Sequence, residues 1–204
     1  CPPTSARCAA AYVPFHGAHQ TGITSRAPAA GLMAAFNLQA ADRAELIDTF
    51  RVLTEETARL MEGEPYDERD PAYPPLYSGT VGNPPPPADL SVIVSVGASM
   101  FDGRYGLADR APRELVPMPF LANDRLDPAF THGDLLLSIS ADSEDVCVFA
   151  LRQLMRRTRG ALLLHWMLDG FNRHDSSASA VPGQAPVRNL MGFKDGTANL
   201  DFTS

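Results

Sequence analysis

Apolar and polar residues alternate with two different periods along this chain, and each change of period marks a predicted element. The even-numbered positions of residues 31–39 are apolar and share one face of an extended chain, which predicts a strand. Apolar residues then recur at helical spacing from Leu46 to Leu60. Because Asp42 stands where an N-cap belongs and Gly63 ends the pattern, we predict an amphipathic helix between them.

The second half of the chain repeats this succession of patterns. Residues 90–96 alternate again and predict a second strand, and residues 135–139 predict a third. Ser143 then starts a helix that reaches Gly160, and residues 161–168 form the fourth strand. The order strand, helix, strand, strand, helix, strand predicts an α+β, ferredoxin-like (split βαβ) fold, in which an antiparallel sheet carries both helices on one face.

Two segments of unusual composition divide the chain into domains. Residues 63–89 are rich in proline, which excludes regular helix and central strand, so we expect a long loop or arm there. The serine and glycine residues that follow the fourth strand indicate a linker from Gly170 onward. We therefore expect a leader and N-terminal loop in residues 1–30, a first ferredoxin-like domain in residues 31–170, and a linker with the start of a second, haem-binding domain in residues 171–204.

Composition and charge exclude several classes of protein. The chain has 204 residues, 45% of them hydrophobic and 20% charged, which is typical of a globular protein with a substantial core. The net charge of -7 and the pI near 5.1 argue against nucleic-acid binding. No apolar run approaches the ~20 residues of a membrane helix, so we expect no membrane span. One basic cluster complements the negative end of the second helix: Arg152, Arg156, Arg157 and Arg159.

The three cysteines leave the redox compartment open. Cys1 and Cys8 are close enough in sequence for a disulfide in the N-terminal leader, and two unpaired thiols explain the sequence equally well. An oxidising compartment would favour the bridge. Cys147 lies among apolar residues of the second helix, where we expect a buried thiol that behaves as a small hydrophobe.

The pattern that most directly suggests chemistry is Gly192-Phe193-Lys194-Asp195-Gly196. The glycines let a flat ligand approach the backbone, while one carboxylate points into the pocket that results. Taken alone, an ordinary Asp-Gly turn, in which Asp195 caps its own backbone, explains the pattern better. Other segments of the chain are needed to decide between these interpretations.

Three segments together resemble the dye-decolorizing peroxidase family. They are Val13-Pro14-Phe15-His16-Gly17-Ala18-His19-Gln20-Thr21-Gly22-Ile23, Thr131-His132-Gly133-Asp134-Leu135-Leu136-Leu137 and Asn189-Leu190-Met191-Gly192-Phe193-Lys194-Asp195-Gly196-Thr197-Ala198-Asn199, in that order. The resemblance implies two ferredoxin-like modules in a dimeric α+β barrel-like fold, with haem b (iron protoporphyrin IX) held by the second. It is nearest to the deferrochelatase/peroxidase branch, which is exported by the twin-arginine route, and so implies a secreted or extracytoplasmic bacterial protein.

The resemblance also implies roles for individual residues. Asp195 matches the family's distal acid, which takes a proton from hydrogen peroxide and returns it to the departing oxygen. Gly196, Thr197 and Ala198 match the stretch whose backbone lies against the haem. The family's axial histidine and distal arginine are expected beyond residue 204, so we assign no metal ligand here and expect the remainder of the same polypeptide to supply it.

None of the five histidines stands where the family has its axial ligand. His16 and His19 lie in the N-terminal loop, where hydrogen bonds to the backbone explain them better than a metal pair does. His132 precedes the third strand and is expected to cap it, and His165 is expected to be a hydrogen-bonded residue of the core or sheet. His174 lies in the linker without an assigned role.

The function that the sequence favours is a haem-dependent peroxidase that uses hydrogen peroxide to oxidise dyes or small phenolic donors. Two alternatives stay open: iron release from haem, as in deferrochelatases of the same branch, and a non-enzymatic ferredoxin-like binding module. The sequence allows an oligomer without requiring one. Bulky donors would need surface relay residues, and for each candidate packing or anchoring is the better explanation: Trp166, Tyr66, Tyr73, Tyr77 and Tyr105.

Overall fold

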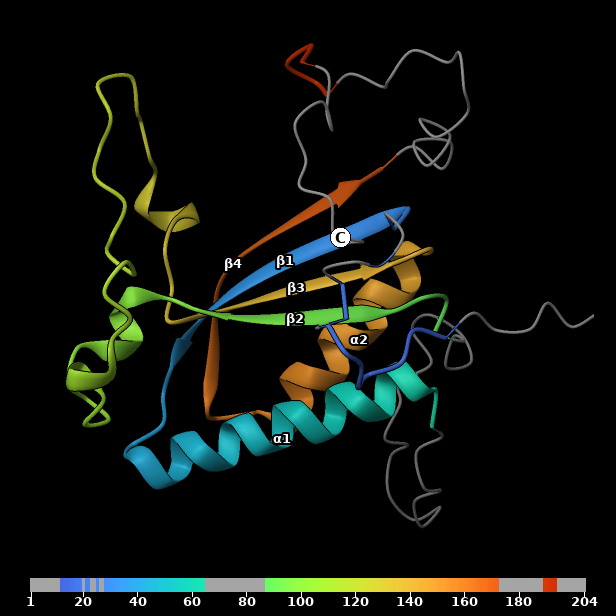
Figure 1. Ribbon diagram of the computed structural model, residues 1–204, viewed down its shortest axis with the longest axis horizontal. Coiled ribbons are helices and arrows are strands. Elements are labelled where there is room, and N and C mark those ends of the chain that lie inside the picture. Colours follow the sequence, from blue (N-terminus) through green and yellow to red (C-terminus); the bar gives the residue numbers. More distant parts are fainter. Residues whose placement is uncertain are drawn as a thin grey trace, which may run out of the picture.

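The computed structural model describes residues 12–19, 21–22, 25, 28–64, 87–172 and 189–193, and shows an α+β fold (Figure 1). Its strands and α-helices are β1 (Ala30–Leu38), α1 (Arg43–Glu62), β2 (Ser91–Val96), β3 (Leu135–Ala141), α2 (Glu144–Arg157) and β4 (Leu162–Phe171). Three short 3-10 helices lie in the long connection between β2 and β3: η1 (Ala98–Phe101), η2 (Ala108–Arg110) and η3 (Pro128–Phe130).

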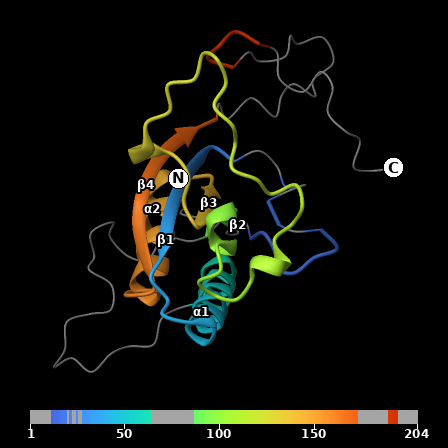
Figure 2. The ribbon, with the colours of Figure 1, turned by 90° about the vertical axis from the view of Figure 1, so that its left-hand side faces the viewer.

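The four strands form one antiparallel sheet with the strand order β2-β3-β1-β4. Figures 1 and 2 show α1 and α2 on the same side of this sheet. Two strand-helix-strand units that interleave in this order are the ferredoxin-like arrangement. The predicted fold class is therefore confirmed.

The core lies between the sheet and the two helices. Phe36 of β1 and Leu137 of β3 are fully buried and belong to one hydrophobic cluster with Leu53 of α1 and Leu154 of α2. Burying one such side chain is worth about 1.5–3 kcal/mol. The apolar positions that the two periods single out in the sequence thus hold the helices on the sheet.

Both ends of α1 follow the prediction. The Asp42 carboxylate accepts a hydrogen bond from the Glu45 backbone N–H at 2.9 Å, and the Glu45 carboxylate accepts one from the Ala41 N–H at 2.7 Å. This reciprocal pair satisfies two backbone donors at the helix start. At the other end Gly63 adopts a φ of 66°, and its N–H donates to the Leu60 carbonyl at 3.3 Å, which ends the helix.

The second helix differs from the prediction in one detail of its cap. Ser143 occupies the N-cap position, but its hydroxyl donates to the Asp145 carboxylate instead of bonding the backbone. Inside α2, Cys147 is buried, and burial raises the pKa of its thiol to about 11. The expectation of a buried thiol among apolar residues is confirmed.

Strand β4 is longer than the sequence predicts. The apolar pattern placed the strand in residues 161–168 and a linker from Gly170 onward, whereas β4 continues to Phe171. Gly170 pairs with Gly31 of β1. The added length comes from backbone hydrogen bonds to β1, which the side-chain pattern of β4 does not reveal.

The sheet face opposite the helices carries exposed apolar side chains. Met33 of β1 pairs with Leu168 of β4, and the two are 49% and 53% exposed. Within the described part of the chain no α-helix covers this face (Figure 2). Ala35 is buried on the same face, because the segment that precedes β3 crosses it at Gly133. That segment therefore closes one end of an otherwise open face.

The connection between β2 and β3 extends away from the sheet as a long excursion (Figure 1). Its first residues form η1 and its last form η3, which contacts β4. The middle of the excursion exposes four large apolar side chains: Val116, Met118, Phe120 and Leu121. Hydrogen bonds to the sheet hold the excursion at its two ends.

Candidate functional site

The residues that the sequence assigns to catalysis and haem binding follow the last described segment of the chain. Asp195, Gly196, Thr197 and Ala198 fall outside the described residues, and the segment before them is described as far as Phe193. Their predicted roles are therefore carried by the sequence and its resemblance. The structure does define the chain that leads to them.

That chain is a closed turn, Asn189–Phe193, which we call the Asn189 turn. The Asn189 side-chain oxygen accepts hydrogen bonds from the backbone N–H groups of Met191 and Phe193, each at 3.1 Å. The Asn189 N–H donates to the Phe193 carbonyl at 2.9 Å, and the Gly192 N–H donates to the Asn189 carbonyl at 2.9 Å. Because Gly192 has a φ of 86°, the turn needs glycine there.

The Asn189 turn presents apolar side chains to its surroundings. Leu190, Met191 and Phe193 are all exposed. Among the described residues no hydrophobic cluster includes them. Within the described residues the turn is therefore held by hydrogen bonds and by the backbone conformation of Gly192, and not by packing of its apolar side chains.

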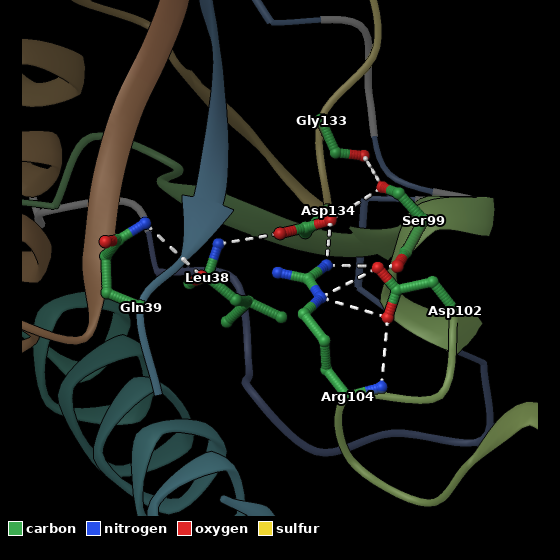
Figure 3. Close-up of polar contacts among 7 residues, drawn as sticks. All are labelled: Leu38, Gln39, Ser99, Asp102, Arg104, Gly133 and Asp134. Atoms are coloured by element: carbon green, nitrogen blue, oxygen red, sulfur yellow. Dashed lines mark hydrogen bonds and ion pairs between the residues drawn. The ribbon is translucent and has the colours of Figure 1, made fainter. Parts of the chain in front are cut away.

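A second polar site lies at the other segment that carries the family resemblance (Figure 3). Asp134, immediately before β3, is 4% exposed. Its carboxylate accepts hydrogen bonds from the Leu38 backbone N–H at 2.8 Å, the Ser99 hydroxyl at 2.6 Å and the Arg104 guanidinium at 2.8 Å. We call Leu38, Ser99, Arg104 and Asp134 the Asp134 junction. It joins the end of β1 and the start of the excursion to β3.

Asp134 and Arg104 each stabilise the charged form of the other. Burial by itself raises the pKa of Asp134, but hydrogen bonds from Arg104, Ser99 and Leu38 outweigh it and lower the pKa below its usual value. The same carboxylate raises the pKa of Arg104, which also donates to Asp102 at 2.8 Å. Both partners are charged at neutral pH, so the junction is an anchor and is poorly suited to proton transfer there.

The backbone just before Asp134 is held by β4. The Trp166 indole N–H donates to the His132 carbonyl at 2.8 Å, and a ring nitrogen of His165 lies 3.1 Å from the Thr131 carbonyl oxygen. The hydrogen-bonded His165 is confirmed. His132 does not cap β3 as predicted: it turns the chain with a φ of 63°, and the Asp134 carboxylate bonds the end of β1.

The other candidate residues that the structure describes have contacts typical of a structural role. His16 packs edge-on against Phe15 in the N-terminal segment. Tyr105 is buried in a small cluster beneath the excursion, and Trp166 is anchored as just described. In the described ranges no three His, Cys, Asp or Glu side chains come together as a metal site. Four candidates lie outside the described residues: Tyr66, Tyr73, Tyr77 and His174.

The basic cluster at the end of α2 lies where its charge was expected to act. Arg156 and Arg157 are in the last turn of the helix, and Arg157 pairs with the buried Glu56 of α1 at 3.4 Å. The positive charges of these arginines therefore stabilise the negative end of the α2 dipole, and the pair with Glu56 stabilises the contact between the two helices.

Neither described α-helix combines the length and the apolar character needed to cross a bilayer.

A model of the N-terminal part of Dyp-type peroxidases matches residues 20–172, well over half of the chain. The chain belongs to the Dyp-type peroxidase family. The resemblance carried by the three sequence segments is confirmed.

Individual relatives agree with this assignment. Deferrochelatase from Escherichia coli strain K12 is 42% identical over 189 residues, which are 92% of this chain and 44% of the relative. An oxyferrous complex of DtpA from Streptomyces lividans matches with a TM-score of 0.77 and 37% identity, over 94% of this chain and 49% of that one. A DyP-type peroxidase from Cellulomonas bogoriensis gives a TM-score of 0.76 and 35% identity, over 94% and 50%. The chain spans about half the length of these relatives.

Sequence reasoning missed the Asp134 junction. Asp134 stood in a segment quoted for its likeness to the family, and nothing marked it as the anchor of the excursion. One signal was present, because an acid directly before a strand with a buried face needs partners for its charge. Arg104, 30 positions away, gave no signal that it is the partner.

Proposed function

We propose that this chain is the N-terminal part of a haem-dependent peroxidase in which Asp195 acts on hydrogen peroxide. The match of residues 20–172 to the N-terminal model of Dyp-type peroxidases carries this proposal. The Asn189 turn supports it, because it delivers an ordered backbone to within two residues of Asp195. Residues 171–204 would then join the first ferredoxin-like domain to a second one.

The described residues fit one wall of a haem site. The Asn189 turn exposes Leu190, Met191 and Phe193, and such apolar side chains suit the apolar body of a porphyrin. Asp195 would lie near the bound peroxide, and Gly196, Thr197 and Ala198 would let the ring approach the backbone. We expect the axial histidine from the remainder of the same polypeptide, since His165 is already bound to the Thr131 carbonyl.

The chemical contribution of this chain is a proton transfer. When bound, haem supplies the iron and the electrons that cleave the O–O bond of hydrogen peroxide. An ionised Asp195 carboxylate takes the proton from one peroxide oxygen and returns it to the other, which leaves as water. Dyes and small phenolic donors would then supply, one at a time, the electrons that restore the haem.

A second candidate function follows from the relatives. The Escherichia coli relative that is 42% identical is named a deferrochelatase. The alternative activity is therefore release of iron from haem. Product analysis separates the two: a peroxidase yields oxidised donor, whereas a deferrochelatase yields free iron and the intact, iron-free ring.

We also propose that the protein is exported by the twin-arginine route to an extracytoplasmic compartment. The support is the resemblance to the exported branch of the family. In that compartment a Cys1–Cys8 disulfide is favoured. A mass spectrum of the secreted protein under non-reducing conditions tests the bridge.

The first test is the visible spectrum of the full-length protein before and after hydrogen peroxide is added. A Soret band that shifts with peroxide supports the peroxidase, and no band even after haem is supplied supports a ferredoxin-like binding module instead. Asp195→Ala should keep the haem spectrum and slow the reaction with peroxide by about 10²–10⁴-fold. An unchanged rate would remove Asp195 from the mechanism.

A further inference from the structure

A pocket between α1 and β2, an edge strand of the sheet, has no part in the proposed function (Figure 1). Its volume is about 280 Å³. The described residues that line it are phenylalanine, leucine, methionine, valine and threonine, so none of them carries a charge. Because an apolar cavity of about 150 Å³ already holds benzene, this pocket has room for one aromatic ring with a small substituent.

Aromatic and aliphatic side chains form most of the pocket lining. Phe15 of the N-terminal segment and Phe50 of α1 are partly buried and pack against the hydrophobic core. Met61, near the end of α1, is 1% exposed and also lines the pocket. Aromatic rings and thioethers make favourable contacts with a further aromatic ring. The lining therefore favours a flat, apolar ligand.

One polar group of the lining lacks a hydrogen-bond partner. Thr57 of α1 is 3% exposed, and its buried hydroxyl makes no hydrogen bond within the described structure. The other two threonines of α1 differ, because the Thr49 and Thr54 hydroxyls each donate to the carbonyl one helical turn earlier at 2.8 Å. A buried hydroxyl without a partner is costly, so a ligand that bonds Thr57 gains from doing so.

We propose that this pocket binds a neutral, single-ring aromatic molecule that carries a hydroxyl group. The ring would occupy the apolar cavity, and its hydroxyl would bond the Thr57 hydroxyl. That hydroxyl is shielded from solvent, and rotation about the Thr57 Cα–Cβ bond, for which a helix allows two rotamers, presents it to the pocket. The inference goes beyond the proposed function, because binding here requires neither haem nor Asp195.

The experiment titrates the full-length protein, without peroxide, with p-cresol and with toluene, which differ by one hydroxyl group. The methyl resonance of Met61 reports binding in this pocket, in protein isotope-labelled at its methionine methyl groups. Met61→Leu assigns the resonance. Both ligands should shift it, and Val94→Phe, which fills the pocket from β2, should abolish both shifts.

Thr57→Val keeps the shape of the side chain and removes its hydroxyl. The affinity for p-cresol relative to that for toluene should fall by about 3–10-fold, because the ligand hydroxyl loses its partner. The matched control is Thr54→Val, since Thr54 also lines the pocket but its hydroxyl already donates to the Phe50 carbonyl. The control should leave the ratio of the two affinities unchanged.

The outcomes are separate from those that test the peroxidase. If neither ligand shifts the Met61 resonance, the pocket is not a binding site and the proposal is wrong. If both bind but Thr57→Val leaves the ratio of affinities unchanged, or Thr54→Val lowers it equally, Thr57 does not recognise the ligand hydroxyl and the proposed ligand class is wrong. Neither result bears on Asp195, whose test is the reaction with peroxide.

Discussion

The Asp134 junction and the Asn189 turn both rely on side-chain oxygens that accept hydrogen bonds, but in opposite settings. Asp134 is charged, 4% exposed, and joined to Leu38 and Arg104, which are 96 and 30 positions away. Asn189 is neutral and exposed, and it binds residues two and four positions away. The difference indicates that the junction joins distant parts of the domain, whereas the turn holds only its own backbone at residues 189–193.

The largest effect on stability is expected at Asp134. Asp134→Asn removes the negative charge from the junction and leaves the Arg104 guanidinium without its buried partner. We expect a loss of about 2–4 kcal/mol in the free energy of unfolding, reduced from the value for a fully buried pair because Arg104 is partly exposed. Urea unfolding of the full-length protein measures it.

Asp102→Asn is the matched control for this change. Asp102 also pairs with Arg104, at 2.8 Å, but its side chain is 45% exposed. Exposed pairs contribute little to stability, so the loss should be much smaller than in Asp134→Asn. Equal losses in the two variants would contradict the view that burial makes Asp134 the anchor.

The next largest effect tests the close packing around the junction. A Cβ on Gly97 would lie 2.1 Å from the Gly133 carbonyl oxygen, so Gly97→Ala must displace the backbone beside Asp134. We expect a cost of about 1–3 kcal/mol. Gly170→Ala, where an added Cβ meets nothing described within 4 Å, should cost nothing measurable by thermal unfolding. If Gly97→Ala is equally harmless, the backbone there is not closely packed.

Acid should weaken the junction over a defined range of pH. Because the pKa of Asp134 is lowered in the folded protein, its contribution to stability is complete above the unfolded pKa of about 3.9. It is lost as the pH falls through the lower, folded pKa. The difference in unfolding free energy between wild type and Asp134→Asn should therefore be constant from neutral pH to about pH 4 and shrink below it. A difference that shrinks already near neutral pH would show that the pKa is not lowered.

The smallest effect on stability is expected at the Asn189 turn. Asn189→Leu should change the free energy of unfolding by less than about 0.5 kcal/mol, as at most exposed positions. A large loss of stability in Asn189→Leu would show that the turn is part of the global fold and would erase the contrast with Asp134.

Structural features that depend only on residues close together in the sequence were mostly predicted correctly. The period of the apolar positions located the four strands and two α-helices of the described residues, although not the three 3-10 helices. Asp42 and Gly63 marked the ends of α1, because a cap acts on backbone within one turn of itself. The prediction was wrong for the end of β4, which extends to Phe171 through pairing with β1. Ladder hydrogen bonds belong to two strands at once, so one strand's side chains do not report them.

The candidate site likewise has features that the sequence predicted and features that it did not. The likeness of three segments identified the family and singled out Asp195. The turn predicted at residues 192–196 lies mostly outside the described residues, and the structure shows a different turn just before it, at residues 189–193. The partners of Asp134 and the backbone role of His132 were not foreseen. They depend on residues brought together only when the sheet forms.

The sequence by itself determined the succession of elements, the fold class, the family and the residue expected to move a proton, since these depend on periodicity and on short motifs. Only the tertiary structure decided which charge is buried and what neutralises it. Leu38, Ser99 and Arg104 reach Asp134 because β1, the excursion and β3 meet at one end of the sheet. A buried carboxylate is stable only with such partners, and the packing of distant segments, not the order of residues along the chain, brings them within hydrogen-bonding distance.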